Sequence, residues 1–213
     1  MFKRSVVLKA NKIKPVGSFK PDYKTVIFFT LFLCGLIIGT TVVNKSESDF
    51  LTLIIKVLKN NITAKNNGGW LKCFCGDFVW LFIPLFTNFL CGLCGIGLPF
   101  IWSIPVVFGC VSGTVFSAFF MSYGIKGLGY CALMYVPSCA ITAATLVKCC
   151  CESTKISSEI FFYILGNGKK EGSKKSLLKE YSTVYIVFCI YILIGAAIST
   201  CSFKLLSGLF GFI

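Results

Sequence analysis

Residues 25–43 read TVIFFTLFLCGLIIGTTVV, an apolar run that contains no charged side chain. A helix rises about 1.5 Å per residue, so a run of this length crosses most of the roughly 30 Å hydrocarbon core of a bilayer. A basic and polar tail precedes the run, which is not the layout of a secretory signal peptide. The run therefore predicts a membrane helix that the protein retains.

The rest of the chain has the same apolar character. Hydrophobic residues make up 56% of it, charged residues only 14%, and the mean hydropathy is +0.83. Soluble domains do not have this composition. We expect an all-α, polytopic membrane protein with about five transmembrane helices and one short amphipathic surface helix. The predicted membrane domain spans 25–213, and its helices cover 25–43, 74–93, 100–122, 126–147 and 183–203.

The surface helix is predicted between the first two membrane helices. Residues 50–59 read FLTLIIKVLK and repeat apolar side chains at helical spacing, interrupted by Lys56 and Lys59. This pattern favours a helix that lies on the membrane with one apolar face. The sequence Asn66-Asn-Gly-Gly69 is expected to end it.

The net charge of +13 comes mainly from lysines between the apolar runs, which favours a role in topology over binding to nucleic acid. The tail 1–24 and the loop 148–182 carry seven basic residues each. The positive-inside rule assigns both to the cytoplasm, with the N-terminus inside and the C-terminus outside. The five lysines between the first two membrane helices oppose this assignment, which places them outside.

Glycine and proline mark the places where helices are expected to turn, bend or approach one another. Small residues four apart lie on one helix face, where another backbone can come close, and they occur at Gly35 and Gly39. The same spacing recurs at 109, 113 and 117. The structural residues that we select are Gly92, Gly95, Gly97 and Pro99 for a turn, Gly109 and Gly113 for a packed face, Gly124, Lys126 and Gly127 for a short connection, and Pro137 for a helix kink.

Side chains suited to catalysis are scarce. Histidine is absent, so Ser and Cys nucleophiles lack their usual base, and there is no phosphate-binding Gly-Lys-Ser loop. Asp77 and Lys126 are expected to be solvated charges at the membrane interface. The sequence therefore predicts no catalytic, cofactor-binding or metal-binding residues. A metal or redox site remains a minor alternative for three cysteine clusters, namely Cys73 with Cys75, Cys91 with Cys94, and Cys149, Cys150 and Cys151.

The segment 92–101, GLCGIGLPFI, is followed by Gly109 and Gly113, by 119–127, FFMSYGIKG, and by Pro137. This order resembles the stage II sporulation protein M family over nearly the whole chain. Family members have a basic tail, one helix, an exported amphipathic stretch, a Gly-Leu-Pro turn, two closely connected helices, a basic loop and a last helix. The family often has Gln-Asn after this proline and a further proline beyond, where this chain has Ser138-Cys139 and Ala143-Ala144.

The resemblance implies a non-enzymatic membrane anchor in endospore-forming bacteria. Its partners would be stage II sporulation proteins D and P, which cut peptidoglycan while the mother-cell membrane engulfs the forespore. It implies the cell membrane, at the septal and engulfing part of the mother cell, as the location. Two alternatives stay open from the residues. One is a small permease or a transporter subunit, since broken helices also build substrate sites. The other is a membrane thiol-redox protein that uses Cys91 and Cys94.

Overall fold

The computed structural model describes residues 23–45, 48–164 and 174–206, and these residues form helices and short turns without a β-strand. The predicted all-α, polytopic membrane fold is confirmed. Residues 1–22 of the basic tail predicted at 1–24 lie outside the described residues, and its last two residues belong to α1. In chain order the elements are α1 (Tyr23–Lys45), α2 (Ser48–Asn67), α3 (Trp70–Leu93), α4 (Leu98–Tyr130), the π-helix η1 (Cys131–Tyr135), α5 (Val136–Ile164) and α6 (Lys174–Leu206).

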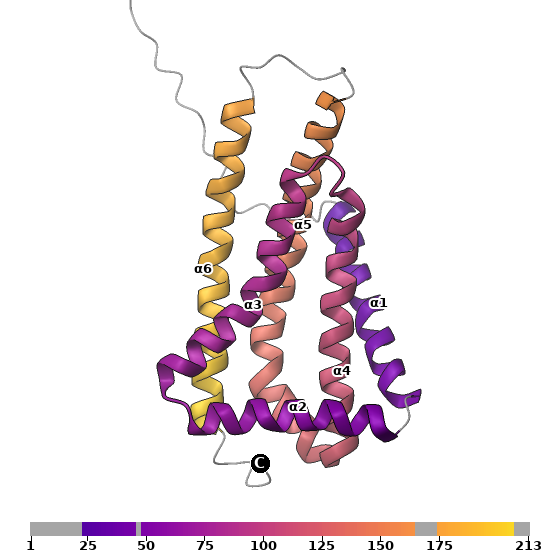
Figure 1. The fold of residues 1–213 in the computed structure, drawn as a ribbon, viewed down its shortest axis with the longest axis vertical. Helices are drawn as coiled ribbons and strands as arrows, with labels where there is room; N and C mark the ends of the chain where they lie inside the picture. Colours follow the sequence, from indigo (N-terminus) through magenta and orange to yellow (C-terminus); the bar gives the residue numbers. More distant parts are fainter. Residues whose placement is uncertain (1–22, 46–47, 165–173, 207–213) are drawn as a thin grey trace, which may run out of the picture.

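Helices α1, α3, α4, α5 and α6 run alongside one another as a bundle, and α2 lies across one end of it (Figure 1). The reversal between α4 and α5 and the last residues of α6 lie at this same end, which we call the α2 end. The short turn between α3 and α4 lies at the other end, which we call the turn end. The amphipathic surface helix expected around residue 50 is thus observed as α2.

Among the described residues, four helical segments are long and apolar enough to cross a membrane: Tyr23–Lys45, Trp70–Leu93, Leu98–Phe161 and Tyr181–Leu205. We expected about five. The difference lies in the third segment, whose 64 residues contain both the helix predicted at 100–122 and the one predicted at 126–147.

The third segment folds back on itself at Gly124, where φ is 56° and ψ is −135°. Glycine adopts a positive φ without the steric cost that a Cβ would bring, so one residue reverses the chain in place of the expected connecting loop. Helices α4 and α5 therefore pack side by side, and Ser112 Oγ of α4 lies 3.5 Å from Cys139 Sγ of α5. Just before Pro137, where we expected a kink, residues 131–135 form a π-helical turn. Proline lacks the N–H that an unbroken α-helix would need there.

The loop predicted at 148–182 was largely wrong. Helix α5 continues to Ile164 and α6 begins at Lys174, so most of the expected loop is helical. The reason is tertiary packing, because Cys149 and Cys150 are completely buried between neighbouring helices and hold this part of α5 in the bundle. The intervening residues 165–173 lie outside the described part of the chain.

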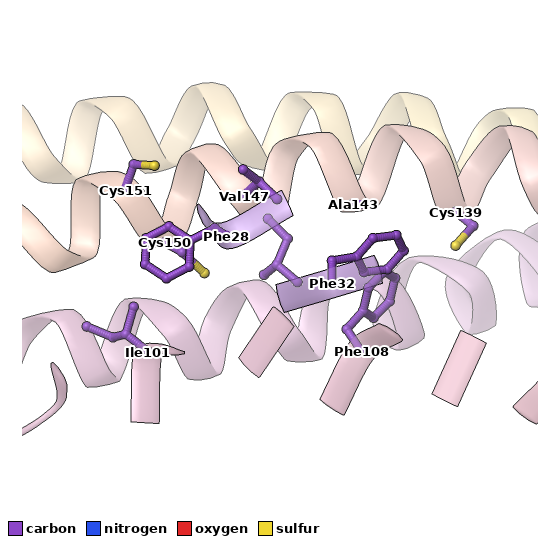
Figure 2. Packing of buried hydrophobic residues seen from close by; sticks show 10 residues of the cluster. Phe28, Phe32, Ile101, Phe108, Cys139, Ala143, Val147, Cys150 and Cys151 are labelled. Atoms are coloured by element: carbon purple, nitrogen blue, oxygen red, sulfur yellow. The ribbon is translucent and has the colours of Figure 1, made fainter. Parts of the chain in front are cut away.

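Among the described residues, two of the three buried hydrophobic clusters lie on either side of α5. On one side α1 and α4 pack against it, and Figure 2 shows the rings of Phe32 and Phe108 lying together. Their ring centroids are 6.0 Å apart. Ala143, Val147 and Cys150 of α5 belong to the same cluster. On the other side α5 packs against α3 and α6. Helix α5 is therefore the central element that holds the outer helices in place.

Candidate functional site

The closest helix contact joins α1 and α4. Gly109 and Gly113 of α4 face α1, and a Cβ at either position would overlap backbone carbonyl oxygens there. Toward the α2 end, Ser117 Oγ donates a hydrogen bond of 3.3 Å to Asn44 Oδ1 of α1. The small residues selected on α4 thus lie on a face that packs against another helix. The opposing carbonyl oxygens belong to Phe32 and Leu36.

The contact is reciprocal, because α1 presents glycines of its own. Gly35 and Gly39 lie against the carbonyl oxygens of Val106 and Cys110 on α4. Each helix therefore contributes a pair of glycines four residues apart. In a bilayer, where lipid tails are as apolar as Leu, such close backbone approach is a main source of helix association. The α1–α4 pair forms one rigid side of the bundle.

Two of the glycines selected for the turn lie so close to other atoms that a side chain would not fit. Gly97 has no room for a Cβ because the carbonyl oxygen of Cys91 lies beside it, and Gly92 has none because of the Tyr181 hydroxyl. Gly95 is buried within the turn, and Pro99 stands exposed in the first turn of α4. The turn at 94–97 is closed by backbone bonds that the amides of residues 94 and 97 donate, with N···O distances of 3.2 and 3.0 Å.

The selected residues near the α4 reversal have different surroundings. Gly124 supplies the positive φ and has open space around it. Gly127 lies against the carbonyl oxygen of Phe119, so a side chain there would overlap backbone. Lys126 is exposed. The sequence thus placed a structural glycine on each side of a surface lysine.

Asp77 is not the solvated charge that we expected. It is 7% exposed and forms an ion pair with Lys65 of α2. Its second carboxylate oxygen accepts a hydrogen bond of 3.2 Å from Thr200 Oγ1 of α6. A search at helical spacing along α3 could not find these partners, because they come from elements distant in the sequence. This carboxylate joins α2, α3 and α6.

Lys204 of α6 also holds the C-terminal end of α2. Its Nζ donates to the carbonyl oxygens of Lys65, Asn66 and Gly68 at 3.0, 3.5 and 2.8 Å. The last carbonyl groups of a helix have no partner within the helix, and a lysine there also complements the helix dipole. Lys204 therefore caps the C-terminal end of α2. We call Lys65, Asp77, Thr200 and Lys204 together the α2 clamp.

Helix α2 has a bound face and a free one. Ile62 is 7% exposed and packs with Phe119, Tyr130 and Phe203 of the bundle. Two apolar side chains point the other way, since Leu53 is 61% exposed and Val57 is 51% exposed. Lys56 and Asn60 are exposed between them, and these four residues make up what we call the outward face of α2.

A buried polar network connects α3, α5 and α6 near the turn end. Asn88 Nδ2 donates to Tyr185 Oη at 3.2 Å, and Ser153 Oγ lies 2.7 Å from Tyr185 Oη and 3.1 Å from Tyr181 Oη. Tyr181 Oη donates to the carbonyl of Phe89 at 3.3 Å. Asn88 Oδ1 is buried and accepts no hydrogen bond from any described residue. No pattern in the sequence had singled out these positions.

The three cysteine clusters differ in their exposure. Cys149, Cys150 and Cys151 are buried as small packing residues, whereas Cys75 and Cys94 are exposed. Among the described residues no group of three or more His, Cys, Asp or Glu side chains is placed to hold a metal ion. Comparison with known proteins found no match to a family model, to a curated protein or to a solved structure.

Proposed function

We propose that the chain is a non-enzymatic anchor in the cell membrane for the peptidoglycan-degrading complex that drives engulfment during endospore formation. The observation that carries the proposal is the way α2 is attached to the end of the bundle. The α2 clamp and the buried side of α2 fix it across the bundle end, while its outward face stays exposed. A rigidly held amphipathic surface loses little conformational entropy when a partner binds it.

The basic residues of the tail 1–24 and of the region 148–182, seven in each, outnumber the five lysines between α1 and α3 that oppose an outside location, and on this count α2 lies outside. Helix α1 begins at the turn end, and the end of α5 and the start of α6, which belong to the basic region 148–182, lie at this end too (Figure 1). The positive-inside rule then places the turn end in the cytoplasm and the α2 end outside. Peptidoglycan lies on that outer side, so α2 would face enzymes that cut it. Stage II sporulation proteins D and P are the partners we propose, from the family resemblance.

The topology can be tested with single-cysteine variants that keep only Cys75 or only Cys94. Both thiols are exposed, and they lie near opposite ends of α3. We expect a membrane-impermeant maleimide to label Cys75 in intact cells and to label Cys94 only after the membrane is opened. Labelling of Cys94 alone in intact cells would show the opposite orientation and would contradict a partner surface on the outer side.

The partner surface can be tested in the sporulating source organism with the double variant L53S/V57S. Both side chains are exposed, so folding should persist, and we expect recovery of peptidoglycan-cutting partners to fall about tenfold if contacts worth about 1.4 kcal/mol are lost. Engulfment should stop after septation, as in a deletion strain. Ile125→Ser is the matched control, because Ile125 is 84% exposed at the same end but lies off α2. Normal engulfment in the deletion strain contradicts the proposal.

A permease or transporter subunit is the second candidate, and the buried polar network favours it. An amide oxygen without a donor inside a membrane bundle is the kind of group that a polar solute or ion could bind. This function predicts solute flux into liposomes that contain the purified chain, reduced by Ser153→Ala. If the liposomes show no solute flux and the deletion strain fails to complete engulfment, the anchor function is supported over the transporter.

A further inference from the structure

One pair of cysteines has a spacing along the chain that lets two thiols meet. Of the thirteen cysteines, only Cys91 and Cys94 lie three or four residues apart. Side chains at this spacing are neighbours on a helix surface, whereas side chains one or two residues apart do not face each other. Cys149, Cys150 and Cys151 are consecutive, and all three are buried. Cys91 and Cys94 are therefore the local pair whose sulfur atoms can be joined.

The backbone holds the pair at a distance that suits a disulfide. Cys91 lies in the last turn of α3, and the amide of Cys94, the residue after α3, donates a hydrogen bond of 3.2 Å to its carbonyl oxygen. The rise and radius of a helix place Cα atoms three residues apart at roughly 5 Å. Disulfides join Cα atoms that are about 4.4 to 6.8 Å apart. A bond between the two sulfur atoms thus requires rotation of side chains and no movement of the helices.

The carbonyl group of Cys94 is held as well. It accepts a hydrogen bond of 3.0 Å from the amide of Gly97 and one of 2.8 Å from Ser157 Oγ of α5. The backbone on both sides of the pair is therefore already ordered, and closing a ring between the two side chains costs little further conformational entropy. Each thiol is present at a high effective concentration for the other.

Both thiols can be reached from outside the bundle. Cys94 is exposed, and Cys91 is half-buried and lines an apolar groove that opens between α3 and α4. The pair lies at the turn end, which the proposed topology places in the cytoplasm. Thiols there are kept reduced, and the disulfides that do form are usually transient and catalytic or redox-sensing. The resting state of this pair is then the dithiol, which an oxidant can convert.

We propose that Cys91 and Cys94 form a site of reversible oxidation, at which a peroxide converts two thiols into one disulfide. The exposed thiol of Cys94 attacks the peroxide, the O–O bond breaks, and a sulfenic acid forms with release of water. The thiol of Cys91 then attacks this sulfur, so that the S–S bond forms, the S–O bond breaks and a second water leaves. The peroxide takes up two electrons, and both thiol protons end in water. A dithiol reductant reverses the oxidation.

The disulfide adds a covalent bond at the place where the amide of Cys94 now holds the last turn of α3. The oxidised chain is therefore expected to keep the end of α3 closed where the reduced chain can open it. This site does not depend on the proposed anchor function, because it involves only the two thiols and a small oxidant.

The test treats the purified full chain with hydrogen peroxide, blocks free thiols with N-ethylmaleimide, reduces the chain and labels the released thiols with deuterated N-ethylmaleimide. We expect peptide mapping to find the deuterated label on Cys91 and Cys94 in equal fractions. Dithiothreitol added before blocking should abolish it. Cys73 and Cys75 are the control within the same chain, because they are two residues apart and only Cys75 is exposed. They should not acquire the deuterated label together.

Cys91→Ser removes the second thiol at almost constant size. The sulfenic acid of Cys94 should then persist and react with dimedone about tenfold more than in the wild type, where the neighbouring thiol consumes it. Cys34→Ser is the matched control, since Cys34 is an exposed thiol of α1 and its loss should leave dimedone labelling of Cys94 unchanged. Size-exclusion chromatography reports the folding of both variants.

Three results would overturn the site. The first is a wild-type pair that stays as free thiols in peroxide, a measurement that needs no variant. The second is equal dimedone labelling of Cys94 in the wild type and in Cys91→Ser. The third is a disulfide between the Cys94 residues of two chains, which a non-reducing gel would show as a dimer.

Discussion

Replacing Gly113 with Leu is expected to lower the free energy of unfolding in detergent by roughly 2 kcal/mol or more. The new side chain would meet the backbone of Leu36, which cannot move aside as the end of a flexible side chain could. Relief requires α1 and α4 to separate along their closest contact. Thermal or denaturant unfolding of the purified chain measures the loss.

The matched control for this variant is Gly76→Leu. Gly76 also lies inside a membrane helix, but nothing surrounds the position where its Cβ would be. We expect the free energy of unfolding of Gly76→Leu to be close to that of the wild type, since the gain in helix propensity from glycine to leucine is favourable in itself. Equal losses in the free energy of unfolding of both variants would show that the effect of Gly113→Leu does not come from the α1–α4 contact.

Removal of the Asp77 carboxylate in Asp77→Leu is expected to cost about 3 to 5 kcal/mol. The change leaves the ammonium of Lys65 without its partner and the Thr200 hydroxyl without its acceptor. Helix α2 would then lose one of its attachments to the bundle, and the buried thiol of Cys73 next to it should react faster with a maleimide. Unfolding measurements and peptide mapping of the labelled thiol check both effects.

Two further variants show whether the cost comes from the buried charge. Lys65→Met combined with Asp77→Leu should recover most of the stability, because a buried ion pair is often replaceable by apolar side chains. Glu152→Gln removes one partner of an exposed pair with Lys155, at 2.7 Å, and should cost less than about 1 kcal/mol. A double variant that is no more stable than Asp77→Leu would contradict the explanation.

Much of the architecture could be predicted from the sequence because membrane helices are local objects. An apolar run of sufficient length must satisfy its own backbone hydrogen bonds in lipid, so α1 and α3 could be located to within a few residues. Glycines four apart define a face on any helix, and for this reason Gly109 and Gly113 were found without knowledge of α1. The periodicity of residues 50–59 likewise predicted α2.

The errors in the sequence analysis share one cause, which is contact between segments that are distant in the chain. Asp77 was assigned to solvent because Lys65 and Thr200 do not lie near it along α3. The prediction of a loop at 148–182 did not take into account that α5 packs against α3 and α6. Ser153 carried no signal at all, since an isolated serine in an apolar run looks the same whether it faces lipid or two tyrosine hydroxyls.

The sequence by itself determined that this protein spans the membrane, which segments are apolar enough to do so, and which glycines allow close approach. These properties follow from composition and helical periodicity, which are local. Only the tertiary structure decided that α2 is clamped across one end of the bundle, that Asp77 is buried in an ion pair, and that α3 and α4 leave a groove between them. These properties depend on how helices meet in space, and local spacing along one helix does not contain that information.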